Sequence, residues 1–233
     1  MNFVCPKKVL VIVAHQDDET IGCGGTINKW SSTNQCEVSV LFITDGQTGI
    51  DQRGLYTKNN ITSTRMIEAF SAAEVLGIKD LDTLMVPCQQ IDEHSQELFH
   101  RVISVIRLHK PELVITHSPQ DKHRDHRAVS KIVAEACWKA KEDIHNELGE
   151  VHTVSDVWGT EITDLHDKVD FAVKLSNKNL KAKLSALAAY SSQEKIIEGM
   201  ASNIEGMAKV RGYSIGTKYA EGFKRISSTP IIL

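Results

Sequence analysis

Short β-rich runs alternate with helical stretches along the first 141 residues. Predicted strands cover residues 9–14, 38–44, 81–86 and 112–116, and predicted helices cover 22–31, 64–76, 97–108 and 126–141. Continuous aliphatic runs such as 9–14 are typical of strands buried on both faces of a parallel sheet. This alternation predicts an α/β fold with a Rossmann-like, mostly parallel sheet and helices on both faces.

The pattern weakens beyond residue 150. Residues 154–160 and 169–175 predict two further strands and 179–190 a helix, whereas the last forty residues fit no single element type. A length of 233 residues suits one α/β domain with extensions, and no linker or repeat is visible. We therefore expect a single domain over residues 1–233, whose C-terminal third, from about residue 150 to 233, completes the substrate side of the site.

Composition excludes several classes of protein. A net charge of −3 provides no basic field for nucleic acid. The longest apolar runs are too short to cross a bilayer, so no transmembrane segment is expected. The five cysteines are odd in number and irregularly spaced, which predicts reduced thiols and a cytoplasmic location.

Two polar clusters each follow a predicted strand. Residues 14–19 read A-H-Q-D-D-E after the first strand, and residues 119–126 read P-Q-D-K-H-R-D-H beyond the fourth. Doubly wound sheets often have the strand order 3-2-1-4-5, and their ligands bind outside the carboxyl ends of the strands where the winding reverses. We therefore expect the site at the C-terminal ends of strands 1 and 4, with the clusters face to face.

These clusters contain the types of side chain that a catalytic metal site requires. His15, Asp18 and His126 form a set of two imidazoles and one carboxylate, and three protein ligands with an open position are typical of catalytic zinc. Asp17 then remains free as a general base. His123 and Asp125 predict an imidazole held by a carboxylate, biased towards its charged form and able to stabilise an oxyanion or donate a proton.

Other residues near the clusters have weaker predicted roles. Glu19 is placed to orient a ligand, and His117 and Asp121 to shape the loop of the second cluster. The bland alternative is that the acidic run only begins a helix, but complementary clusters at two strand ends favour a metal site. Gly22, Gly24 and Gly25 do not match the dinucleotide-binding spacing and indicate close helix–sheet packing instead.

The paired motifs resemble the PIG-L/LmbE-like family of metal-dependent N-deacetylases. Members carry A-H-P-D-D-E and H-x-D-H, which here read A-H-Q-D-D-E (14–19) and H-R-D-H (123–126). The resemblance continues through 44–46, 65–77, 183–193 and 219–223, and so covers nearly the whole chain. It implies a zinc-dependent hydrolase that removes an N-acetyl group from an N-acetylglucosamine-type glycoside, glycolipid or glycoconjugate, giving acetate and a free amine.

The resemblance also implies roles for single residues. His15, Asp18 and His126 would bind Zn²⁺, with Fe²⁺ as the alternative metal. Asp17 would be the general base, and His123 the oxyanion stabiliser oriented by Asp125. Arg65 aligns with an arginine that contacts the sugar in related enzymes; a solvated helix charge is the alternative.

Two departures and two alternatives remain. Gln16 replaces the usual proline, which is expected to loosen the turn and leave a polar group facing the site, and Tyr190 stands where related bacterial enzymes often have histidine. Both bear on the substrate more than on the chemistry.

The alternatives are an amidase acting on a larger N-acyl amino-sugar conjugate and a non-catalytic Rossmann-like sugar- or nucleotide-binding protein. A homo-oligomer is left open.

Overall fold

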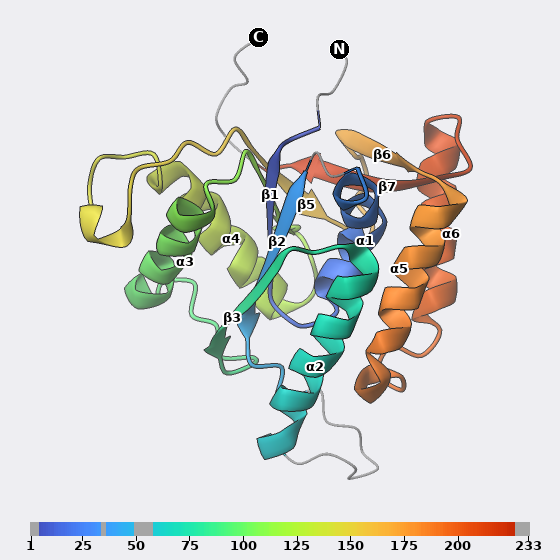
Figure 1. Ribbon diagram of the computed structural model, residues 1–233, viewed down its shortest axis with the longest axis horizontal. Helices are drawn as coiled ribbons and strands as arrows, with labels where there is room; N and C mark the ends of the chain where they lie inside the picture. Colours follow the sequence, from blue (N-terminus) through green and yellow to red (C-terminus); the bar gives the residue numbers. More distant parts are fainter. Residues whose placement is uncertain (1–4, 34–35, 49–57, 227–233) are drawn as a thin grey trace.

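The computed structural model describes residues 5–33, 36–48 and 58–226 (Figure 1). One seven-stranded sheet has the order β3-β2-β1-β4-β5-β7-β6. Strands β1 to β5 pair in parallel, and β7 pairs antiparallel with both β5 and β6. The predicted α/β class and the order of the first five strands are confirmed. The strands are Lys8–Val13, Glu37–Thr44, Asp80–Val86, Leu113–His117, Asp156–Thr160, Phe171–Leu175 and Tyr219–Arg225.

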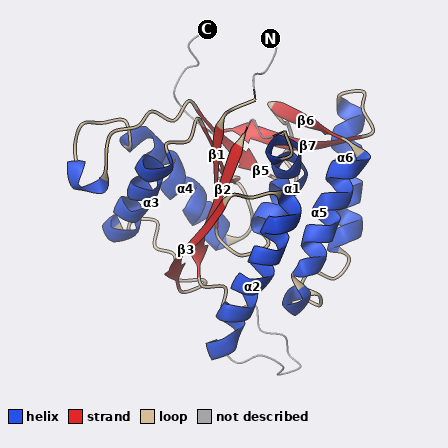
Figure 2. Cartoon of the chain, in the orientation of Figure 1, coloured by secondary structure: helices blue, strands red, loops and turns tan. Residues whose placement is uncertain are grey.

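Helices cover both faces of the sheet (Figure 2). On one side lie α3 and α4, and on the other α1, α2, α5 and α6. The side chains of β1 alternate between the two layers, because Leu10 and Ile12 belong to the core beneath α3 and α4, whereas Val9, Val11 and Val13 belong to the opposite one. Within the described residues, the α-helices are Asp18–Ser31, Lys58–Leu76, Gln96–His109, Arg124–Lys139, Asn177–Ala189 and Met200–Ser214.

The C-terminal region contains the elements that the sequence left ambiguous. Helix α6 precedes β7, which lies between β5 and β6 in the sheet. Pairing with β5 and β6, which come earlier in the chain, stabilises β7. Such partners cannot be predicted from the local sequence pattern of β7. Among the described helices, none is long and apolar enough to cross a membrane.

Helix α1 begins four residues earlier than predicted and is interrupted. Its first turn contains Asp18 and Glu19, and the backbone leaves helical geometry at Cys23, with φ −141° and ψ 18°. Beyond this break the carboxylate of Glu221 on β7 accepts hydrogen bonds from the N–H groups of Gly25 and Thr26, at 2.9 and 2.6 Å. Glu221 also pairs with the buried ammonium group of Lys183. The C-terminal part of the chain thus stabilises α1 through the contacts of Glu221.

Candidate metal and catalytic site

The two polar clusters meet where β1 and β4 end. The strands are direct neighbours, with Val11 paired to Ile115, so the segments that follow them leave the same edge of the sheet. Nε2 of the buried His117 accepts a hydrogen bond from the N–H of Ala14 at 2.7 Å. The expected convergence of the two clusters is therefore present in the fold.

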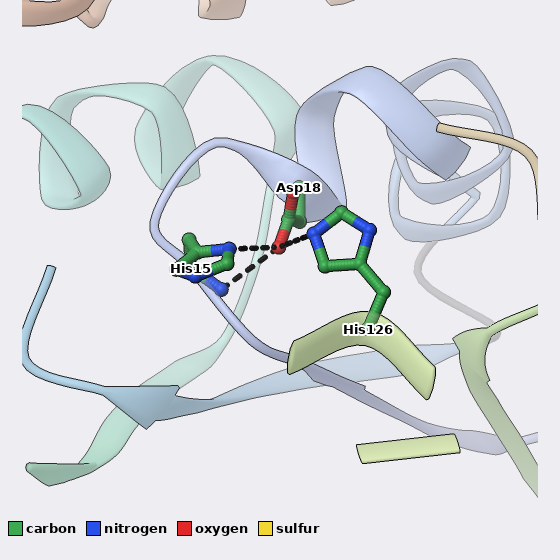
Figure 3. A group of neighbouring side chains, drawn as sticks. All are labelled: His15, Asp18 and His126. Atoms are coloured by element: carbon green, nitrogen blue, oxygen red, sulfur yellow. Dashed lines mark hydrogen bonds and ion pairs between the residues drawn. The ribbon is translucent and has the colours of Figure 1, made fainter. Parts of the chain in front are cut away.

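His15, Asp18 and His126 point toward one another (Figure 3). Oδ2 of Asp18 lies 3.1 Å from Nδ1 of His15 and 3.3 Å from Nε2 of His126. One ligand atom from each residue lies within 4.8 Å of the others. Burial opposes ionisation of Asp18, but the two imidazoles lower its pKa well below the usual value. An ionised carboxylate between two imidazole nitrogens fits a divalent cation of the zinc type.

A carboxylate behind His126 was missed as a partner for this group. Oδ2 of Asp121 lies 3.1 Å from Nδ1 of His126, and Oδ1 accepts the N–H of His123 at 2.8 Å. From its place in the sequence, Asp121 is expected only to shape the loop of the second cluster. Carboxylates that hold the outer nitrogen of a ligand histidine fix its orientation and raise its basicity. Its place five residues before His126 gave no sign of this contact.

Asp17 lies beside the group in a strained conformation. It precedes α1 with φ 121° and ψ −27°, a region that costs a non-glycine residue about 1–3 kcal/mol. Burial raises the pKa of its carboxyl to about 7, although the nearby Arg65 opposes the shift. A carboxyl that titrates near neutral pH is suited to general base chemistry.

Arg65 on α2 is buried rather than solvated, with 4% of its surface exposed. Its Nη2 lies 3.1 Å from Oδ2 of Asp17 and also donates to the carbonyl oxygen of Gln16. Its Nη1 donates to the carbonyl oxygen of Gly46 at 3.3 Å. The alternative of a solvated helix charge is therefore wrong. Contact between Arg65 and a sugar stays a prediction.

His123 and Asp125 do not form the predicted pair. Oδ2 of Asp125 instead lies 3.2 Å from Nε2 of His15 and accepts the N–H of Gln89 at 2.8 Å. The His123 ring caps α4, where its Nδ1 accepts the backbone N–H of Asp125 at 3.2 Å. Within the described residues, no hydrogen bond joins the two side chains.

The electrostatics of His123 differ from the expectation as well. Burial and the neighbouring imidazoles of His126 and His15 lower the pKa of His123, so the expected charged form is not favoured. Because Nδ1 accepts a hydrogen bond, the proton of a neutral His123 lies on Nε2. A neutral Nε2–H is still a donor, and so an oxyanion-stabilising role remains chemically open to this side chain.

The two departures from the family pattern are buried side chains. Gln16 is fully buried, and its Nε2 donates to the carbonyl oxygen of Thr44 at 2.9 Å, which ties the turn to the end of β2. The expected loosening of the turn is therefore not seen. Tyr190 is 1% exposed, and its hydroxyl donates to Oε1 of Glu19 at 2.7 Å.

Comparison with known proteins gives a consistent family assignment. Residues 10–137 match the PIG-L family model, described as GlcNAc-PI de-N-acetylase. A diacetylchitobiose deacetylase from Thermococcus kodakarensis is 29% identical over 229 residues, which cover 94% of this chain and 82% of the relative.

Solved structures share the fold over nearly the whole chain. The N,N′-diacetylchitobiose deacetylase from Pyrococcus horikoshii superposes with a TM-score of 0.85 and 26% identity, covering 95% of this chain and 84% of its own. A 4-carboxy-2-hydroxymuconate hydratase from Pseudomonas putida gives 0.84 at 21% identity, covering 97% and 98%. The second likeness shows the fold alone, and its different reaction means that function must be argued from the site.

Proposed function

Because this chain belongs to the PIG-L family, we propose that it hydrolyses the acetamide of an N-acetylated amino sugar, releasing acetate and a free amine. The observation that carries the proposal is the position of Asp17, a buried carboxyl with a pKa of about 7, directly beside the His15–Asp18–His126 group. The deacetylases among the matched proteins support an acetylated amino sugar as the substrate class.

His15, Asp18 and His126 would hold one divalent cation, with zinc as the proposed ion and ferrous iron as the alternative. When bound, the ion would supply Lewis acidity, lowering the pKa of water and polarising the acetamide carbonyl. Asp121 and Asp125 would hold the outer nitrogens of His126 and His15, at 3.1 and 3.2 Å.

The remaining residues would move protons and bind charge. Asp17 would take a proton from the attacking water, whose oxygen forms a bond to the acyl carbon. The neutral Nε2–H of His123 would donate to the oxyanion that develops on the former carbonyl oxygen. The C–N bond then breaks as a proton reaches the sugar nitrogen. After the first step Asp17 carries the proton taken from water, and we assign to Asp17 the transfer of this proton to the sugar nitrogen.

The chain's location and the alternatives belong to the same proposal. All five cysteines are free, which supports a reducing, cytoplasmic setting.

An amidase acting on a larger acyl group would use the same residues but require more space for the acyl chain. A non-catalytic sugar- or nucleotide-binding protein would need neither metal nor base, and the raised pKa of Asp17 beside three potential ligands favours an enzyme over it.

The test is acetate release by the zinc-loaded protein from N-acetylglucosamine, N,N′-diacetylchitobiose and N-acetylated nucleotide sugars, with longer N-acyl analogues in parallel. Asp17→Asn should retain the zinc and lower kcat about 10²–10⁴-fold, since it removes the base at constant size. No release from any of these compounds by the metal-loaded wild type, or near-normal turnover by Asp17→Asn, would contradict the proposal.

A further inference from the structure

The backbone of Asp17 is held by a buried carboxylate two residues away. The N–H of Asp17 donates to Oε2 of Glu19 at 3.1 Å, and the carbonyl oxygen of Asp17 accepts the N–H of Ile21 at 2.9 Å. The backbone N–H and carbonyl groups of Asp17 are therefore both hydrogen-bonded in the conformation with φ 121°. A non-glycine residue keeps such a conformation only where its surroundings enforce it.

Glu19 needs partners of its own, because it is only 1% exposed. Its carboxylate accepts hydrogen bonds from neutral donors that include the N–H of Asp17, the hydroxyl of Thr20 and the hydroxyl of Tyr190. Asp17 and Thr20 are close to Glu19 in sequence, so their contacts with it are local. Tyr190 comes from the C-terminal end of α5, 171 residues further along the chain. Tyr190 therefore links this turn to the C-terminal part of the fold.

We propose that Tyr190 and Glu19 are positioning residues for the general base: the Tyr190 hydroxyl fixes the Glu19 carboxylate, which fixes the strained backbone of Asp17. This inference rests on the proposed function. Neither side chain contacts substrate in this assignment. Their effect is on the aim of the Asp17 carboxylate, and small errors in the position of a catalytic group reduce rate more than binding.

Tyr190→Phe is the sharpest variant, since it removes one hydroxyl and keeps the buried ring. In the zinc-loaded protein, kcat for acetate release should fall about 10- to 100-fold. KM and the zinc content should stay near wild type, whereas the melting temperature should fall, because the buried Glu19 carboxylate loses one of its donors. Tyr213→Phe is the matched control, because Tyr213 on α6 is 88% exposed. Glu19→Gln is the second variant, because an amide has one acceptor oxygen where the carboxylate has two, so the donors of Asp17, Thr20 and Tyr190 can no longer be accepted as they are in the wild type.

The decisive measurement adds Tyr190→Phe to Asp17→Asn. If Tyr190 acts through Asp17, the hydroxyl should have little further effect once the base is gone, so the two losses should not multiply. A merely structural tyrosine would cause the same fractional loss in both backgrounds, and that result would overturn the inference. So would wild-type kcat in both Tyr190→Phe and Glu19→Gln, or a loss of kcat that only tracks lost zinc. An inactive wild type would instead refute the proposed function.

Discussion

Arg65 and Asp17 form a buried ion pair, with 3.1 Å between Nη2 of Arg65 and Oδ2 of Asp17. The arginine comes from α2 and the aspartate from the turn between β1 and α1, 48 positions apart in the sequence. The guanidinium therefore reaches the proposed base directly, whether or not it also reaches a sugar hydroxyl.

The Arg65–Asp17 pair predicts which kinetic constant changes. Arg65→Lys should keep a positive charge but lose the planar fork that binds Asp17, Gln16 and Gly46 together, so kcat should fall more than KM rises. Arg65→Ala should also cost about 3 kcal/mol of unfolding free energy, because it leaves a buried polar site unpaired. Steady-state kinetics and urea unfolding measure both. A rise in KM at constant kcat would instead favour direct contact with the substrate.

The proposed ligands predict a loss of metal binding. His15→Ala or His126→Ala should lower the zinc content well below one ion per chain, as measured by elemental analysis after dialysis. Zinc at 100 times its dissociation constant should stabilise the wild type by about 2.7 kcal/mol, and this gain should disappear in the variants. His94→Ala is the control, since the side chain of His94 is 87% exposed. Full zinc occupancy in both ligand variants would refute the assignment.

Asp125 has a different predicted effect from the one that the motif suggested. Its carboxylate contacts His15 rather than His123, so Asp125→Asn should weaken zinc binding about 10- to 100-fold, as expected for a residue that holds a ligand. Competition with a chromogenic chelator measures the affinity. Asp164→Asn serves as the control, because Asp164 pairs with Lys122 on the surface. Unchanged affinity with reduced turnover would restore the pairing of Asp125 with His123.

His166 predicts a pH dependence of stability away from the metal group. Burial lowers the pKa of its imidazole, and its Nε2 lies 3.2 Å from the carbonyl oxygen of Gly159. A folded-state pKa below the unfolded value of about 6.5 gives stability that is present above that pH and lost as the pH falls below it. His166 should therefore lower the unfolding free energy at pH 5.5 relative to pH 7.5, so that the change on going from pH 7.5 to 5.5 should be more positive in His166→Gln than in the wild type. An equal change in both proteins would contradict this account.

Local sequence determined the elements of the parallel half and the positions of both polar clusters. The aliphatic run at 9–14 is typical of a strand at the centre of a sheet, and polar residues that follow such a strand lie at its carboxyl end. The strand order of doubly wound sheets then predicted that His15 and His126 meet. These inferences succeed because burial and chain direction are written into neighbouring residues.

Tertiary structure decided which side chains contact one another at that edge. Asp121 lies behind His126, Asp125 faces His15, and Arg65 reaches Asp17, although the motif places Asp125 two residues from His123. Each contact depends on the direction in which a carboxylate points from its turn or helix end. Packing in the folded chain selects the rotamer that gives this direction. The sequence thus determined which polar side chains the site contains and at which edge of the sheet they lie. Packing between segments far apart in the chain decided which of them pair, as for Glu19 and Tyr190, which are 171 residues apart.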